Sequence, residues 1–129
     1  MAIVLNTNPK ITVDLPNGIY LLDSMSSTGK TYMCTILQSV ASKYRDVLVY
    51  NYRDYINSGM YPLSFVGKYK LIVADRFDMY ADDAEVLNLL LKHSDSAVVL
   101  LDKKSIYDIP LKAKYAFLDL EEDSIWIDN

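Results

Sequence analysis

Short apolar runs of four or five residues recur along this chain of 129 residues, and they constrain its fold more than any other feature. Apolar runs without polar alternation are typical of strands that are buried on both faces of a parallel sheet. Longer polar or helical segments separate the runs, as the crossover between two parallel strands requires. The runs are Gly18–Leu22, Val47–Tyr50, Leu71–Ala74, Ala97–Leu101 and Tyr115–Leu118.

Two of the separating segments have the period of an amphipathic helix. From Gly29 onward, apolar residues recur at spacings of three and four. The segment from Asp82 to Leu91 has acidic residues in its first turn and Lys92 and His93 at its end, as the helix dipole favours. Strands that alternate with helices predict βαβ units, with helices on both faces of a mainly parallel sheet.

The whole chain, residues 1–129, is predicted to form one domain, because its length fits a single hydrophobic core. Two short strand-like runs with turn residues between them predict an N-terminal hairpin over residues 1–17. Residues 18–118 form the predicted core, and residues 119–129 an acidic tail with an edge strand at Ser124–Ile127. We therefore expect a three-layer α/β/α sandwich around a five-stranded sheet, with the hairpin added to it.

Composition and charge exclude several classes of protein. A net charge of −4 gives no general attraction to nucleic acid, so direct contact with DNA or RNA is not expected. The single cysteine, Cys34, rules out an internal disulfide and is expected to be a small core residue. The single histidine, His93, rules out a His-rich metal site and argues against a Ser-His-Asp triad. No signal peptide or membrane-spanning run is present, which predicts a cytoplasmic protein.

The residues between the first apolar run and the first helical segment carry the clearest chemical signal. They match the phosphate-binding pattern G-x-x-x-x-G-K-[ST] at every defined position but the first. A loop before a helix N-terminus directs backbone N–H groups toward an anion, and Gly29 allows a close approach. Lys30 places a positive charge at the β- and γ-phosphates, and the Thr31 hydroxyl binds Mg²⁺. The expected nucleotide-binding residues are Ser24, Met25, Ser26, Ser27, Thr28, Gly29, Lys30 and Thr31.

In this motif the chain resembles the P-loop NTPases, and the resemblance covers about Gly18 to Leu118. The run that ends in Asp75 is similar to the family's second signature, an apolar strand with a metal-holding aspartate at its end. One strand-like run lies between the two motifs, as in the additional-strand division that includes AAA+ and RecA-like ATPases. The resemblance implies a sheet whose first strand lies between the fifth and the fourth, and Mg²⁺ held by Thr31 and Asp75. It also implies ATP rather than GTP, and the guanine signature N-K-x-D is missing.

Two departures from the family pattern bear on binding and on hydrolysis. Ser24 replaces the first glycine of the motif, which leaves open a loosened loop that still binds nucleotide or a decayed one that does not. Arg76 stands where related ATPases usually carry a water-activating glutamate, so a carboxylate base for hydrolysis is not assured. The weak candidates for a catalytic role are Asp78 as a base, Asp102 as a sensor of the γ-phosphate, and Arg76 as a phosphate contact. The catalytic residues are therefore left open, and so is the choice between a weak or partner-stimulated NTPase and a protein that only binds nucleotide.

A second hypothesis is a non-catalytic interaction module, a regulator or inhibitor of phage or mobile-element origin on a degenerate P-loop scaffold. The small size, Ser24, Arg76 and eleven tyrosines favour it, because tyrosines are frequent at interfaces. Both hypotheses include a protein partner or a homo-oligomer. A small-molecule kinase is disfavoured, because the chain has only three arginines and no room for a lid. Trp126 in the acidic tail either anchors the terminus or contacts a partner.

Overall fold

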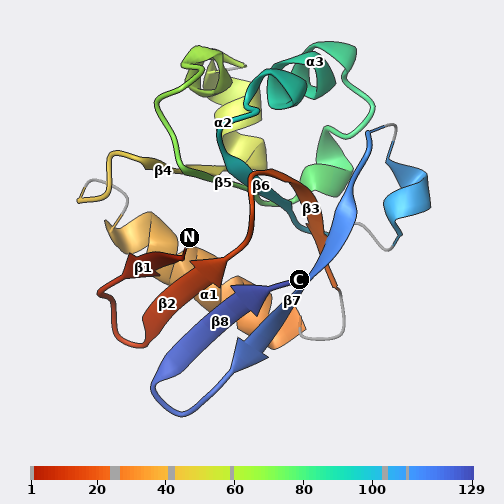
Figure 1. Cartoon of the computed structure of the whole chain (residues 1–129). Helices are drawn as coiled ribbons and strands as arrows, with labels where there is room; N and C mark the ends of the chain where they lie inside the picture. The colour runs from red at the N-terminus through yellow and green to blue at the C-terminus, as the bar shows by residue number, and fades with distance from the viewer. Residues whose placement is uncertain (1, 24–26, 41–42, 59, 103–104, 110) are drawn as a thin grey trace.

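The computed structural model describes residues 2–23, 27–40, 43–58, 60–102, 105–109 and 111–129, with the backbone alone at residues 27–31, 40 and 108 (Figure 1). Within these residues the chain forms one sheet of eight strands, in the order β1-β2-β8-β7-β3-β6-β5-β4. The strands are β1 (Ile3–Leu5), β2 (Lys10–Asp14), β3 (Gly18–Leu22), β4 (Val47–Tyr50), β5 (Leu71–Ala74), β6 (Ala97–Leu100), β7 (Lys114–Leu120) and β8 (Ser124–Asp128).

The described residues also form three α-helices, α1 (Ser27–Val40), α2 (Tyr52–Ser58) and α3 (Ala84–Lys92), and short 3₁₀ helices that include η2 (Tyr61–Ser64), η3 (Phe77–Met79) and η4 (Ile106–Asp108). Asp83 caps α3 by accepting the backbone N–H groups of Glu85 and Val86. Among the helices of the described residues, none has both the length and the apolar character that crossing a membrane requires.

Helix α2 was not expected, because Gly59 and Pro62 make this part of the sequence look broken. A reciprocal pair of hydrogen bonds starts it. The N–H of Asp54 donates to Asn51 Oδ1 at 2.9 Å, and the N–H of Asn51 donates to Asp54 Oδ2 at 3.1 Å. This is the geometry of a capping box, and the Asn-x-x-Asp spacing is the sequence signal that would have revealed the helix.

Five neighbouring strands of the sheet are parallel, in the order β7-β3-β6-β5-β4. All five were expected from the apolar runs, with small differences in their bounds. The first of them along the chain, β3, lies between the fourth, β6, and the fifth, β7. This agrees with the strand order that the resemblance implies.

The predicted three-layer sandwich around a five-stranded sheet is nevertheless wrong. The described sheet has eight strands with mixed directions and curls into a half-barrel, because β7 changes partner along its length. Its residues 114–116 pair with β3, whereas residues 117–120 pair with β8. The expected edge strand β8 therefore lies inside the sheet, where it also pairs in parallel with β2. The expected hairpin is present as the antiparallel pair β1-β2, but it continues the sheet instead of standing apart.

The curled sheet has a hydrophobic core on each side. On one side, α1 packs against β1, β2 and β8 as well as the parallel strands, and Met33, Cys34 and Leu37 are buried there. On the other side, α3 and the 3₁₀ helices η2 and η3 cover the parallel strands, with Phe77 and Leu90 at the centre. Figure 1 shows α2 and α3 together on one side and α1 on the other. The burial of Cys34 confirms its expected place in the core.

Candidate functional site

Polar residues follow four of the parallel strands at their carboxyl ends. Leu100 of β6 pairs with Leu21 of β3 on one side and with Ala74 of β5 on the other, so these strands end at one common edge. Ligands of open parallel sheets bind beyond this edge. The strand ends at this edge carry Asp23, Asn51, Asp75 and Asp102.

The expected phosphate-binding segment connects β3 to α1 at the same edge. Ser24, Met25 and Ser26 lie outside the described residues, as do the side chains from Ser27 to Thr31. The backbone of α1 begins at Ser27, two residues before the expected start of the helix at Gly29. Because β3 neighbours β6, the N-terminus of α1 belongs to the edge that carries Asp102. The anion-binding geometry of the loop itself stays a prediction.

Asp75 and Asp102 form a carboxyl pair between the ends of β5 and β6. The Asp75 side chain is half-buried, and its carboxyl group lies close enough to that of Asp102 to be affected by its charge. Burial raises the pKa of Asp75 above its ordinary value, and the negative charge of Asp102 raises it further. The backbone N–H of Arg76 donates to Asp102 Oδ2 at 3.1 Å and holds this carboxylate in place. The two groups together can take up a proton or a cation.

Unusual backbone conformations bring the two aspartates together. Arg76 has a φ of 53° and Asp102 a φ of 70°, both in the left-handed region that favours glycine. Such a conformation costs of order 1 kcal/mol or more for a residue with a side chain, and it is concentrated at functional sites. Both residues stand where a strand has just ended, so the strain is stored at the edge where the phosphate-binding segment begins.

Arg76 and Asp78 bind each other. Arg76 Nε donates to Asp78 Oδ1 and Nη2 to Asp78 Oδ2, both at 3.1 Å, in a two-pronged ion pair that is open to solvent. The ion pair gives Arg76 a fixed partner in place of its candidate role as a phosphate contact. This ion pair engages both oxygens of Asp78, which was the candidate general base.

Tyr80 contacts the backbone at the ends of β4 and β5, and the sequence did not indicate this role. Its hydroxyl donates to the backbone oxygen of Asp75 at 2.6 Å and lies 3.2 Å from that of Tyr50. Burial raises the pKa of Tyr80, so the hydroxyl stays protonated as a donor. Its ring packs edge-on against Tyr50 and Phe77. No motif marks Tyr80, because its role depends on the chain turning back under the end of β5.

The remaining singled-out residues lie away from this edge. His93 caps the end of α3 as expected, and it is buried with Nε2 2.7 Å from the backbone oxygen of Leu63. Among the described residues, no three His, Cys, Asp or Glu side chains are grouped closely enough to hold a metal ion. The donors at the edge that suit a divalent cation are the oxygens of Asp75 and Asp102.

Changing Asp102 to asparagine is expected to lower the pKa of Asp75. The change removes the neighbouring charge, while the amide oxygen still accepts the N–H of Arg76. The raised pKa means that the folded protein holds its proton more tightly than the unfolded chain. Wild-type stability therefore falls as the pH rises from 3.8, the ordinary value, through the folded pKa. NMR titration of the Asp75 carboxyl carbon measures the shift, and an equal midpoint in both proteins would contradict the pairing.

Comparison with known proteins adds nothing to the description of the carboxyl edge. No protein-family model matches the chain, and neither a curated protein nor a solved structure matches it. The chemistry of the site therefore has to follow from the residues that surround it: one helix N-terminus, one Gly-Lys-Thr sequence and two paired aspartates.

Proposed function

We propose that the protein binds a nucleotide, ATP with Mg²⁺, at the carboxyl edge of its parallel strands. The observation that carries the proposal is the shared edge. The Gly-Lys-Thr sequence lies in the first turns of the helix after β3, and the ends of the next two strands carry Asp102 and Asp75. A phosphate-binding sequence and a pair of cation-binding carboxylates thus belong to neighbouring positions of one sheet.

Each part has a separate task in this proposal. The amides at the start of α1 and the Lys30 ammonium bind the phosphates. Mg²⁺ would be held by Thr31 and Asp75, where it offsets phosphate charge. A bound cation would offset the repulsion between the Asp75 and Asp102 carboxylates. The motif segment is the contact to the nucleotide, and the strand ends are the contact to the metal.

Hydrolysis by the isolated protein is expected to be slow. Arg76 follows Asp75 where a water-activating acid would be useful, and Asp78 is engaged with Arg76. A general base has to reach the attacking water with its carboxylate available. Faster turnover therefore needs a partner that supplies or frees a catalytic group, as arginine fingers do for other NTPases.

Calorimetric titration tests the proposal directly. Mg-ATP is expected to bind with a dissociation constant of about 1 mM or lower, which corresponds to a binding free energy of about −4 kcal/mol or more favourable. ATP in the presence of EDTA should bind more weakly, and GTP should bind no better than ATP. No binding of either nucleotide at millimolar concentration with Mg²⁺ present would refute the proposed function.

An interaction module without catalysis is the second candidate, and one surface favours it. Tyr61, Phe65 and Val66 lie together at and after η2 with exposed fractions of 68%, 38% and 52%. Tyr61 and Phe65 stack edge-to-face with ring centroids 5.0 Å apart. Rigid aromatic groups in solvent are typical of protein interfaces. This candidate requires that Lys30→Ala leaves partner binding intact and that Tyr61→Glu abolishes it.

A further inference from the structure

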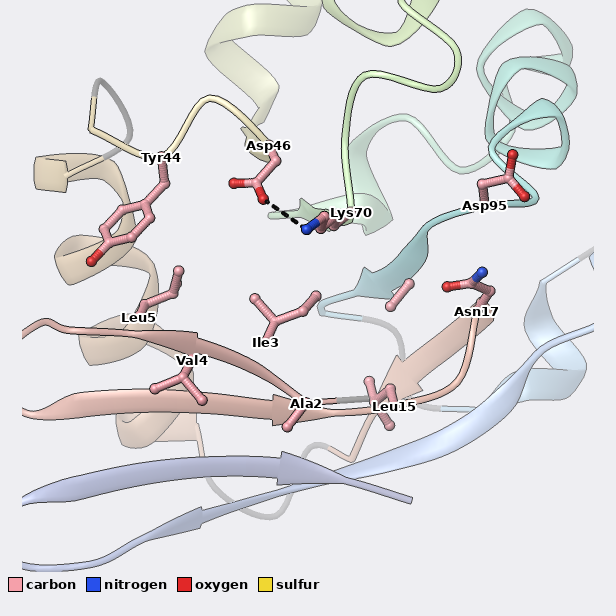
Figure 2. A pocket seen from close by; sticks show the side chains of 11 residues that line it. Ala2, Ile3, Val4, Leu5, Leu15, Asn17, Tyr44, Asp46, Lys70 and Asp95 are labelled. Atoms are coloured by element: carbon pink, nitrogen blue, oxygen red, sulfur yellow. Dashed lines mark ion pairs between the residues drawn. The ribbon is translucent and has the colours of Figure 1, made fainter.

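A cavity of about 490 Å³ lies at the opposite end of the parallel strands from the candidate nucleotide site. Figure 2 shows β1 along one side of it and the residues that precede β4, β5 and β6 along the other. Ile3, Leu15 and Ala97 supply apolar surface, and Asp46, Lys70 and Asp95 supply charge. Its volume is in the range of ligand-binding pockets.

The cavity borders the edge of β1 rather than one of its faces. Four consecutive residues, 2–5, line it. Since successive side chains of a strand point to opposite faces, a cavity on one face would be lined by alternate residues only. Within the described residues β1 pairs with β2 alone, and β1 is the last strand of the sheet. The cavity is therefore next to a strand edge with unpaired backbone groups.

A hydrogen bond made by Asn6, the residue that follows β1, indicates which amides of the strand face the cavity. The N–H of Asn6 donates to the hydroxyl of Tyr44 at 2.9 Å, and Tyr44 lines the cavity. Backbone N–H groups alternate in direction along an extended strand, so the N–H of Val4 points to the same side as that of Asn6. Val4 thus presents its N–H and C=O to the cavity, at hydrogen-bonding reach for an added strand.

The opposite wall has an excess of negative charge. Lys70 and Asp46 form an exposed ion pair, with Nζ and Oδ2 3.9 Å apart, and offset each other. Asp95 forms no ion pair among the described residues and is exposed. An occupant that carries a positive charge opposite Asp95 is therefore favoured, with its apolar side chains against Ile3, Leu15 and Ala97.

From the free strand edge, the cavity beside it and the charge of its far wall, we propose that β1 binds an extended peptide segment of a partner protein. The segment adds a strand to β1 through the backbone of Val4. Its side chains alternate, so that apolar residues enter the cavity and a lysine or arginine reaches Asp95. This site does not depend on the proposed nucleotide binding, because it lies at the other end of the sheet.

The test uses a library of random heptapeptides displayed on phage, selected in parallel on the wild-type protein and on Val4→Pro. Proline removes the N–H that faces the cavity and is tolerated on an edge strand. The wild type is expected to enrich peptides with alternating apolar residues and a basic residue. These peptides should lose affinity by about tenfold or more on Val4→Pro, which corresponds to one or two backbone hydrogen bonds.

Two further measurements keep the test independent of how well Val4→Pro folds. In the wild type, hydrogen exchange of the Val4 amide should slow when a selected peptide binds. Asp95→Lys should weaken binding, whereas Asp119→Lys, which reverses an exposed charge on β7, should not. The proposal is overturned if Val4→Pro selects the same peptides as the wild type, or if the wild type selects no peptides. Self-association through β1 without peptide binding also overturns it and assigns the edge to a second copy.

Discussion

Replacing Lys30 with alanine is expected to weaken the binding of Mg-ATP by about 10- to 100-fold. A charge-assisted contact to a phosphate contributes about 1.5–3 kcal/mol, and 1.4 kcal/mol corresponds to a factor of ten in the dissociation constant. Calorimetric titration of both proteins measures the ratio of the two constants. The free energy of unfolding should change little, so loss of binding would not reflect loss of the fold.

Lys92→Ala is the matched control for this change. Lys92 is an exposed lysine in the last turn of α3, a helix that leads into the amino end of β6. It should leave nucleotide affinity unchanged, because the proposed phosphate site is at the carboxyl end of the strands. If wild type and Lys30→Ala bound Mg-ATP with equal affinity, the motif would not be part of the nucleotide site.

Replacing Phe77 with alanine is expected to lower the free energy of unfolding by about 3–5 kcal/mol. Phe77 is 0% exposed and packs edge-on against Tyr80, with ring centroids 5.6 Å apart. Its backbone N–H donates to the oxygen of Leu101 at 3.1 Å, which links the ends of β5 and β6. The substitution leaves a cavity in the core that α3 and the 3₁₀ helices form against the parallel strands.

Urea denaturation measures this effect, and Phe117→Ala is its control. Phe117 lies on β7 with 45% of its surface exposed, so its truncation should cost about 1 kcal/mol or less. Equal losses of stability for the two variants would contradict the assignment of Phe77 to the core.

The sequence revealed the parallel strands because burial on both faces leaves a local signal. Each of the five apolar runs became a strand, and Gly18–Leu22, Val47–Tyr50 and Leu71–Ala74 have the bounds that were expected. The helix around residues 84–92 was equally visible, since its cap and charges lie within a few residues of it. Features that a few neighbouring residues determine can be predicted in this way.

The curl of the sheet could not be predicted, because it depends on pairing between distant segments. No turn residue interrupts residues 114–120, yet residues 114–116 pair with β3 and residues 117–120 with β8. Nothing local indicates that β8 pairs with β2, more than a hundred residues away along the chain. The sandwich followed from treating these outer strands as separate from the core.

At the candidate site, the sequence singled out Asp75 and Asp102, and the motif singled out the segment from Ser24 to Thr31, whose phosphate-binding role stays a prediction. The proximity of the two aspartates, the left-handed backbone at Arg76 and the hydrogen bond from Tyr80 follow from tertiary structure alone. The ion pair between Arg76 and Asp78 joins residues two positions apart, but no sequence pattern predicted it.

The most direct test of nucleotide binding at the carboxyl edge is an NMR titration of the ¹⁵N-labelled protein with Mg-ATP. The amide signals of Gly29, Lys30 and Thr31 are expected to shift most, followed by those of Asp75 and Arg76. Signals from β1 should stay in place, because β1 borders the cavity at the opposite end. Unchanged spectra at millimolar Mg-ATP, or shifts confined to residues 2–5, would contradict the account.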